Sequence, residues 1–242
     1  MQRTGLALEA AIINGTERGT KIVRRRFGRV CVTDVRVNNL DAHRIGKRAG
    51  RYITIEGDPI EHAVPMLLEK ALQQLLPIKG RMLVAGLGNP DVARDSLGVR
   101  VIRKLNCGSA DSGVVAIETD VSAKTGIETA RMVRGVVCEL DVSCVLAVDA
   151  LACCDPLKIG KTVQVSDTGV QPGSGVHSDS PALDRGFVGV PVVAVGVPMV
   201  SELSGITGNQ SHMNYLAAPA NEDELSEIWA GVIAEAVNSL CI

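Results

Sequence analysis

The chain has 242 residues, enough for one large domain with a buried core and too few for an array of domains. Aromatic residues make up 2% of the sequence, so side chains that stack on nucleotide bases are scarce and base-reading RNA modules are disfavoured. The formal net charge of -2 conceals an asymmetry, because residues 1–51 carry 12 Lys or Arg against 4 Asp or Glu. A basic arm therefore precedes an acidic body.

The first predicted element is a β-hairpin in this arm. Residues 21–26 and 29–37 alternate β-branched with polar side chains on either side of Phe27-Gly28, a pattern typical of two strands joined by a tight turn. Arginines at positions 24, 25, 26 and 29 could attract an acidic partner or a substrate bound to nucleic acid. A charge run this short is more often a solvated hairpin tip. We therefore expect no direct contact with nucleic acid.

The rest of the chain predicts an α/β core. A short strand is expected at residues 52–56, and an amphipathic helix begins near residue 59. Buried-type strands then alternate in part with helical stretches: strands at 82–86, 114–117, 145–148, 162–165 and 192–197, and helices at 96–105, 126–140 and 222–240. This order predicts a mostly parallel sheet flanked by helices. We expect a single α/β domain over residues 1–242, with a β-rich arm at 1–57 and the core at 80–242.

Cysteine usage and hydropathy indicate the compartment. The seven cysteines form an odd number without C-x-x-C spacing, which signals neither a zinc site nor a disulfide framework. The first residues lack the pattern of a signal peptide, and no apolar run reaches the ~20 residues that a membrane span requires. We expect a cytoplasmic protein with reduced thiols and no membrane contact.

Two aspartates stand where strands of the core are predicted to end. Asp95 follows a glycine turn, A-G-L-G-N-P at residues 85–90, and precedes a helix; a dinucleotide-binding loop would need a third glycine at Asp91. Asp149 ends the apolar run at 146–148, where a charge is costly unless it is paired, hydrogen-bonded or protonated. Two converging carboxylates could act as general base and general acid. The alternatives are a helix-capping Asp95 and a buried Asp149 satisfied by loop amides.

A third loop after a predicted strand contains Asp167 and Thr168 in a D-T-G triplet. The triplet occurs in pepsin-like proteases, but those folds are all-β, so we interpret Asp167 as a turn-forming or supporting residue of the site. The glycine-rich stretch that follows would admit a substrate backbone, through Gly173, Ser174 and Gly175.

Histidine spacing gives no metal signal. Among His43, His62, His177 and His212 there is no H-E-x-x-H pattern and no neighbouring Cys ligand. His177, in the glycine-rich stretch, is the one histidine we keep as a possible site residue. We expect neither a metal nor a cofactor.

Motifs along most of the chain resemble those of the germination protease of spore-forming bacteria. The segments R-T-G-L-A-L-E-A at residues 3–10 and G-R-Y-I-T-I-E at 50–56 are similar to the start of that family. Further matches follow in order: G-L-G-N at 86–89, D-S-L-G at 95–98, T-G-I-E-T at 125–129, A-V-D-A-L-A at 147–152, S-D-T-G at 166–169, P-G-S-G-V at 172–176 and G-V-P at 196–198. The chain is identified as a shortened or divergent member.

The resemblance implies an atypical aspartic endopeptidase that degrades small acid-soluble spore proteins during germination in the spore core. Carried over by position, its catalytic aspartates are Asp95 and Asp149. Asn89 is expected to bind the substrate or to support the two aspartates. It further implies a fold shared with hydrogenase maturation proteases and a homo-oligomer, a tetramer in the family. The family is made as a zymogen, but Gly5 replaces an acidic residue of the processing site and few residues precede it, so the sequence gives little support for a pro-segment here.

Three other interpretations stay open at this point. Residues 89–99 also resemble hydrogenase maturation proteases, which hold nickel, so chelator dependence would separate the two. Peptidyl-tRNA hydrolase shares G-L-G-N-P but needs a histidine where this chain has Ala93 to Ser96. A sporulation protein that keeps the fold and binds a partner without cutting it is the third.

Overall fold

A computed structural model describes residues 4–16, 19–77, 79–107, 113–171, 181–212 and 215–240. Its strands are β1 (Lys21–Phe27), β2 (Val30–Val37), β3 (Gly50–Glu56), β4 (Met82–Gly86), β5 (Val114–Glu118), β6 (Cys144–Cys153), β7 (Thr162–Ser166), β8 (Val192–Glu202) and β9 (Leu216–Ala217). Its α-helices are α1 (Ala7–Asn14), α2 (Asn39–Ile45), α3 (Ala63–Leu75), α4 (Leu97–Ile102), α5 (Ser122–Thr125), α6 (Thr129–Leu140), α7 (Arg185–Val188), α8 (Leu203–Thr207) and α9 (Glu222–Asn238). Short 3-10 helices are η1 (Ala93–Asp95), η2 (Pro156–Lys158) and η4 (Gln210–His212).

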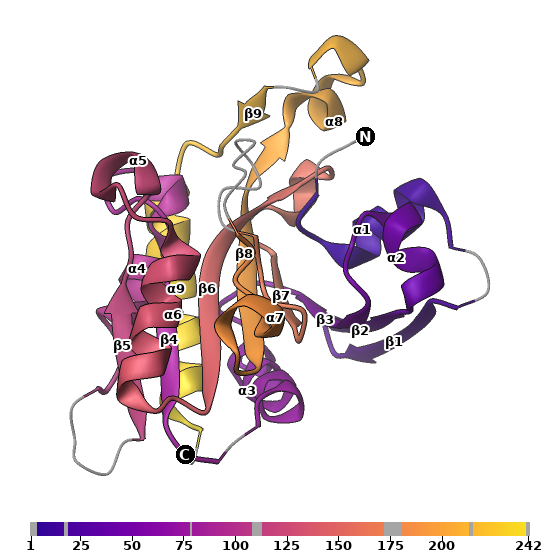
Figure 1. The fold of residues 1–242 in the computed structure, drawn as a ribbon. Coiled ribbons are helices and arrows are strands. Elements are labelled where there is room, and N and C mark those ends of the chain that lie inside the picture. Colours follow the sequence, from indigo (N-terminus) through magenta and orange to yellow (C-terminus); the bar gives the residue numbers. More distant parts are fainter. Residues whose placement is uncertain are drawn as a thin grey trace.

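The strands form one mixed sheet in the order β1-β2-β3-β7-β8-β6-β4-β5, with β9 paired to β8 (Figure 1). Parallel pairing joins β5, β4, β6 and β8, as the sequence predicts for the core. All pairs from β1 to the β7–β8 junction are antiparallel, so the sheet is mixed rather than mostly parallel. One cause is the two-residue turn at Gly28-Arg29, which can join strands only in the antiparallel sense. The α/β class with flanking helices is confirmed; a single domain stays a prediction.

Helices cover both faces of the sheet, and side-chain alternation along the strands explains why. Val84 and Val148 point into a core with α3, α4 and α9, whereas Ala85 and Ala147 point to the opposite core with α6 and α7. Figure 1 shows α6 and α7 in front of the sheet and α9 behind it. A third cluster joins α1 and α2 to β2 and β3. The strand β4 and the first five residues of β6 are therefore buried on both faces, which accounts for their continuous apolar sequences, whereas the edge strand β5 is only partly buried.

Trp229 anchors the C-terminal helix to the sheet. Its side chain is fully buried among the residues of the α3, α4 and α9 core, and its indole N–H donates to the carbonyl oxygen of Gly160 at 2.9 Å.

In the described part of the chain, no helix is both long and apolar enough to cross a membrane.

Several elements differ from the sequence prediction. The helices α1 and α2 are not predicted, because their short sequences carry little helical periodicity. The helix α3 begins at Ala63 rather than at residue 59, since Pro59 lies in a turn. The strand β6 continues to Cys153, five residues beyond the predicted end, because β8 pairs with it along this length.

Candidate active site

The loop after β4 lies directly on the backbone of β6, and glycines make this possible. The amide of Leu87 donates to the carbonyl oxygen of Val148 at 2.8 Å. A Cβ atom on Gly98 would lie 2.4 Å from that same oxygen and 2.3 Å from the Leu87 nitrogen, closer than side chains approach. A Cβ on Gly88, which has a φ of 108°, would lie 1.9 Å from the carbonyl oxygen of Asp95. These contacts place the start of α4 at the carboxyl end of β4, against β6.

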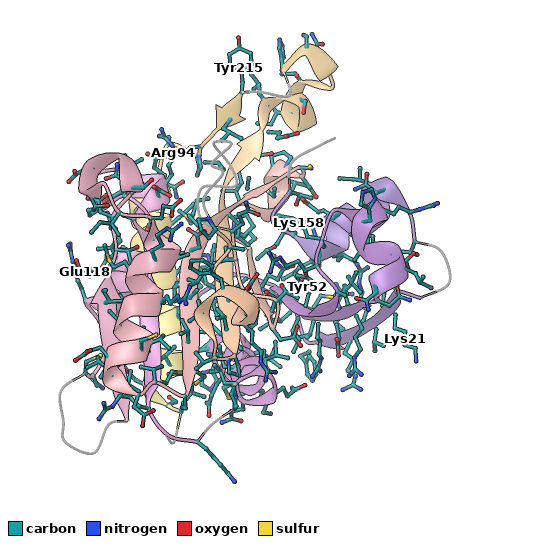
Figure 2. The ribbon with its side chains drawn as sticks, viewed as in Figure 1. Lys21, Tyr52, Arg94, Glu118, Lys158 and Tyr215 are labelled. Carbon is teal, nitrogen blue, oxygen red and sulfur yellow. The ribbon has the colours of Figure 1, made fainter. Side chains whose placement is uncertain are left out.

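Asp95 is held at this end of the sheet by its own loop. It is the last residue of η1, and its Oδ2 accepts a hydrogen bond from the Asn89 amide at 2.8 Å. Burial raises the pKa of Asp95, and the negative charge of Asp120 adds to the rise, while the Asn89 amide and the Arg94 charge oppose it. Figure 2 labels Arg94, the residue that precedes Asp95 in the chain. The carboxyl is thus partly buried, with one directed hydrogen bond.

Asp149 lies in β6 just past the point where β4 stops pairing. The last β4–β6 pair is Gly86 with Val148, whereas Asp149 still pairs with Gly196 of β8. The prediction that Asp149 ends its strand is therefore wrong, although the residue does stand at the carboxyl end of the neighbouring β4. Its side chain lies on the same face as Ala147, two residues earlier in the strand, and therefore on the α6 side of the sheet.

The two carboxyls lie close enough to influence each other. The pKa of Asp149 is raised to about 7, by burial first and by the charge of Asp95 second, against a hydrogen bond from the Ala150 amide at 2.9 Å. A carboxyl near a second carboxylate and out of bulk water keeps its proton to higher pH. With a pKa of about 7, Asp149 is partly protonated at neutral pH.

A cation organises the rim of the site, and sequence reasoning missed it. Lys124 Nζ donates to Asn89 Oδ1 at 2.8 Å, forms an ion pair with Asp91, and lies 3.4 Å from Asp120 Oδ2. Asp120 follows β5, so the rule that selected Asp95, a carboxylate after a core strand, would have selected it too. Lys124 thereby binds the side chain of Asn89, and the backbone N–H of Asn89 donates to Asp95.

The segment before α1 lies against β6 two to three residues beyond Asp149. The amide of Gly5 donates to the carbonyl oxygen of Ala152 at 2.7 Å, and Gln164 of β7 accepts from the Ala7 amide at 2.8 Å. A Cβ on Gly5 would lie 2.9 Å from Cβ of Leu151, so glycine suits this close passage. The chain start is therefore part of the surroundings of the candidate site.

The other predicted site residues are not brought to this pair. Asp167 Oδ1 accepts from the Arg51 amide at 2.7 Å, which ties the end of β7 to the start of β3. Because β7 runs antiparallel to β8, Asp167 and Thr168 lie at the opposite end of the sheet from Asp149. Gly173, Ser174, Gly175 and His177 lie outside the described residues.

Within the described ranges, no three His, Cys, Asp or Glu side chains are grouped so that they could hold a metal ion.

The close contact at Gly98 yields a stability prediction. Replacing Gly98 with Ala forces the start of α4 away from β6, so we expect a loss of about 1–3 kcal/mol in the free energy of unfolding despite the better helix propensity of Ala. The matched control is Gly135→Ala in α6, where an added Cβ meets nothing within 4 Å and Ala should stabilise by up to about 1 kcal/mol. Urea unfolding checks both; equal stability of the two variants would contradict the contact.

The raised pKa of Asp149 makes stability depend on pH. A carboxyl whose pKa is higher in the folded than in the unfolded state stabilises the fold at low pH, and this contribution is lost as pH rises through about 7. We expect Asp149→Asn to gain stability relative to the wild type between pH 4 and pH 8, by up to about 4 kcal/mol. Asp141→Asn, at the exposed C-cap of α6, is the matched control for the substitution itself. A pH-independent difference between wild type and Asp149→Asn would refute the pKa assignment.

Comparison with known proteins finds similarity over most of the chain. The family model described as germination protease matches residues 13–218. Germination proteases of Clostridium tetani and Halalkalibacterium halodurans are each 34% identical, over 87% and 86% of this chain and over 74% and 65% of their own lengths. The relative from Caldanaerobacter subterraneus is 32% identical over 93% of this chain and 76% of its own.

Among solved structures, a NiFe hydrogenase maturation protease from Thermococcus kodakarensis aligns with 71% of this chain and 98% of its own, at a TM-score of 0.45 and 18% identity. The family match runs from the last residues of α1 to just past β9, a range that spans positions 95 and 149. On this evidence the chain belongs to the germination protease family.

Proposed function

We propose that this chain is an endopeptidase of spore germination that hydrolyses peptide bonds with the Asp95–Asp149 pair. Family membership supports a peptidase role in germination. The observation that carries the mechanism is the raised pKa of both carboxyls, one of which responds to the charge of the other. Such a pair can hold one proton at neutral pH, which is what general acid–base hydrolysis of an amide requires.

The surroundings of each carboxyl suggest which one carries the proton. Asp95 accepts a hydrogen bond from the backbone N–H of Asn89 and lies near the positive charge of Arg94. Both interactions favour the ionised form of Asp95. Asp149 has the pKa of about 7 and is the protonated partner below that pH. Ionised Asp95 would take a proton from the attacking water, and Asp149 would donate its proton to the carbonyl oxygen or the leaving amine. Activity should therefore fall as pH rises above about 7.

Lys124 and Asn89 are positioning residues in this proposal. The Lys124 ammonium donates to the side chain of Asn89, and the backbone N–H of Asn89 donates to Oδ2 of Asp95, which orients the Asp95 carboxyl. Neither needs to touch the substrate for this role.

The substrate and setting are proposed from the resemblance. We propose that the substrates are small acid-soluble spore proteins, that the enzyme works in the spore core, and that it assembles as a homo-oligomer. Relatives at 32–34% identity carry the name germination protease, which supports the setting.

Cleavage by matched variants tests the proposal. A purified small acid-soluble spore protein is incubated with wild type, Asp95→Asn, Asp149→Asn and the control Asp141→Asn, each with and without a chelator. We expect the wild type and the control to cut, and each site variant to lose at least about 100-fold in rate, as for removal of a general acid or base.

Two outcomes would overturn this assignment. Equal rates in all four proteins would remove the carboxyl pair from the chemistry. Loss of wild-type activity on chelation would instead favour a metal-dependent peptidase of the hydrogenase-maturation type.

A further inference from the structure

The strand β1 forms the free outer edge of the sheet, on the opposite side of the molecule from the candidate active site. It pairs with β2 alone among the described strands, so the outward backbone N–H and C=O groups of its other edge are open to another chain. All seven of its residues are exposed. In Figure 2, Lys21 marks this edge and Arg94 marks the active-site end. Whatever binds at β1 is thus spatially separate from Asp95 and Asp149.

The charge of this edge is positive and uncompensated. Arg24, Arg25 and Arg26 take part in no ion pair in the described part of the chain, and Arg24 donates only a long hydrogen bond, 3.4 Å, to Thr33. The carboxylate on the neighbouring strand, Asp34, is already engaged by Arg51 through contacts of 2.8 and 3.1 Å. Among the described residues, these three neighbouring guanidinium groups are therefore exposed without an ionic partner.

Both faces of β1 carry the same combination of charge and apolar surface. Side chains alternate along a strand, so Ile22, Arg24 and Arg26 lie on one face and Val23, Arg25 and Phe27 on the other. Ile22, Val23 and Phe27 are 43%, 49% and 45% exposed. A nucleic acid backbone laid on one face would leave the other face unused and would bring nothing apolar to these side chains. An added strand reaches both faces at once.

We propose that β1 binds an extended acidic segment of a partner protein as an additional strand. Backbone groups of the segment would pair with the open edge, glutamates or aspartates would pair with Arg24 to Arg26 on both faces, and flanking apolar residues would cover Ile22, Val23 and Phe27. The same arginines disfavour pairing of β1 with a second copy of itself, because like charges would then face each other across the ladder. The partner is therefore an acidic, β-forming peptide rather than another copy of this chain.

A short peptide probe tests the proposal by fluorescence anisotropy. The probe VVEEEVV, labelled with fluorescein, matches the pattern of β1 in charge and apolarity. We expect it to bind the full chain, and the triple variant Arg24→Gln, Arg25→Gln, Arg26→Gln to bind it at least tenfold more weakly. The matched control removes three exposed cations elsewhere, through Arg103→Gln, Lys104→Gln and Arg131→Gln, and should bind like the wild type. Circular dichroism verifies that both triple variants are folded.

Two further probes separate strand addition from charge attraction. PVEEEVP keeps the charge but replaces two valines with proline, which lacks an N–H donor and resists strand pairing, so we expect it to bind at least tenfold more weakly than VVEEEVV. A DNA duplex of about 20 base pairs should not displace the peptide. Undiminished binding by the arginine triple variant, equal binding of PVEEEVP, tighter binding of the duplex, or no binding of VVEEEVV would each overturn the proposal.

Discussion

The close approach of the loop after β4 to the backbone of β6 is the contact on which the site depends. Gly98 lets the start of α4 lie against the carbonyl oxygen of Val148, one residue before Asp149. Gly88 lets the loop fold back on Asp95 itself. A larger side chain at either position would push the two carboxyls apart. The glycines of this segment thus serve to bring an acid from a loop next to an acid from a strand, rather than to bind phosphate.

Bringing two carboxyls together in a partly buried position costs stability, and the surrounding residues reduce this cost unequally. Asp95 accepts a hydrogen bond from the Asn89 backbone N–H and lies near Arg94, and both interactions stabilise its negative charge. Asp149 has one local amide from Ala150, and its pKa rises to about 7. This asymmetry is what allows two chemically identical groups to hold different protonation states at the same pH. The proposed general acid–base role and the expected loss of stability with rising pH then have the same physical origin.

Much of this arrangement could be predicted from the sequence. The strands of the core stand out as apolar runs, and the rule that functional groups collect at the carboxyl ends of parallel strands selects both Asp95 and Asp149. The same rule applied to β5 would have found Asp120. The extension of β6 beyond Asp149 could not be foreseen, because it depends on pairing with β8, which is distant in the chain. Asp167 also follows a strand, but only the tertiary pairing shows that β7 is antiparallel to β8 and carries Asp167 away.

Asp149 holds its proton first because it is buried and second because the Asp95 carboxylate lies beside it. Carbon-13 NMR titration of the aspartate carboxyls in the wild type and in Asp95→Asn measures this directly. We predict an apparent pKa near 7 for Asp149 in the wild type and a clearly lower value in Asp95→Asn, because the repulsion from the Asp95 carboxylate is removed. An unchanged pKa in the variant, or an ordinary value near 4 in the wild type, would contradict the account.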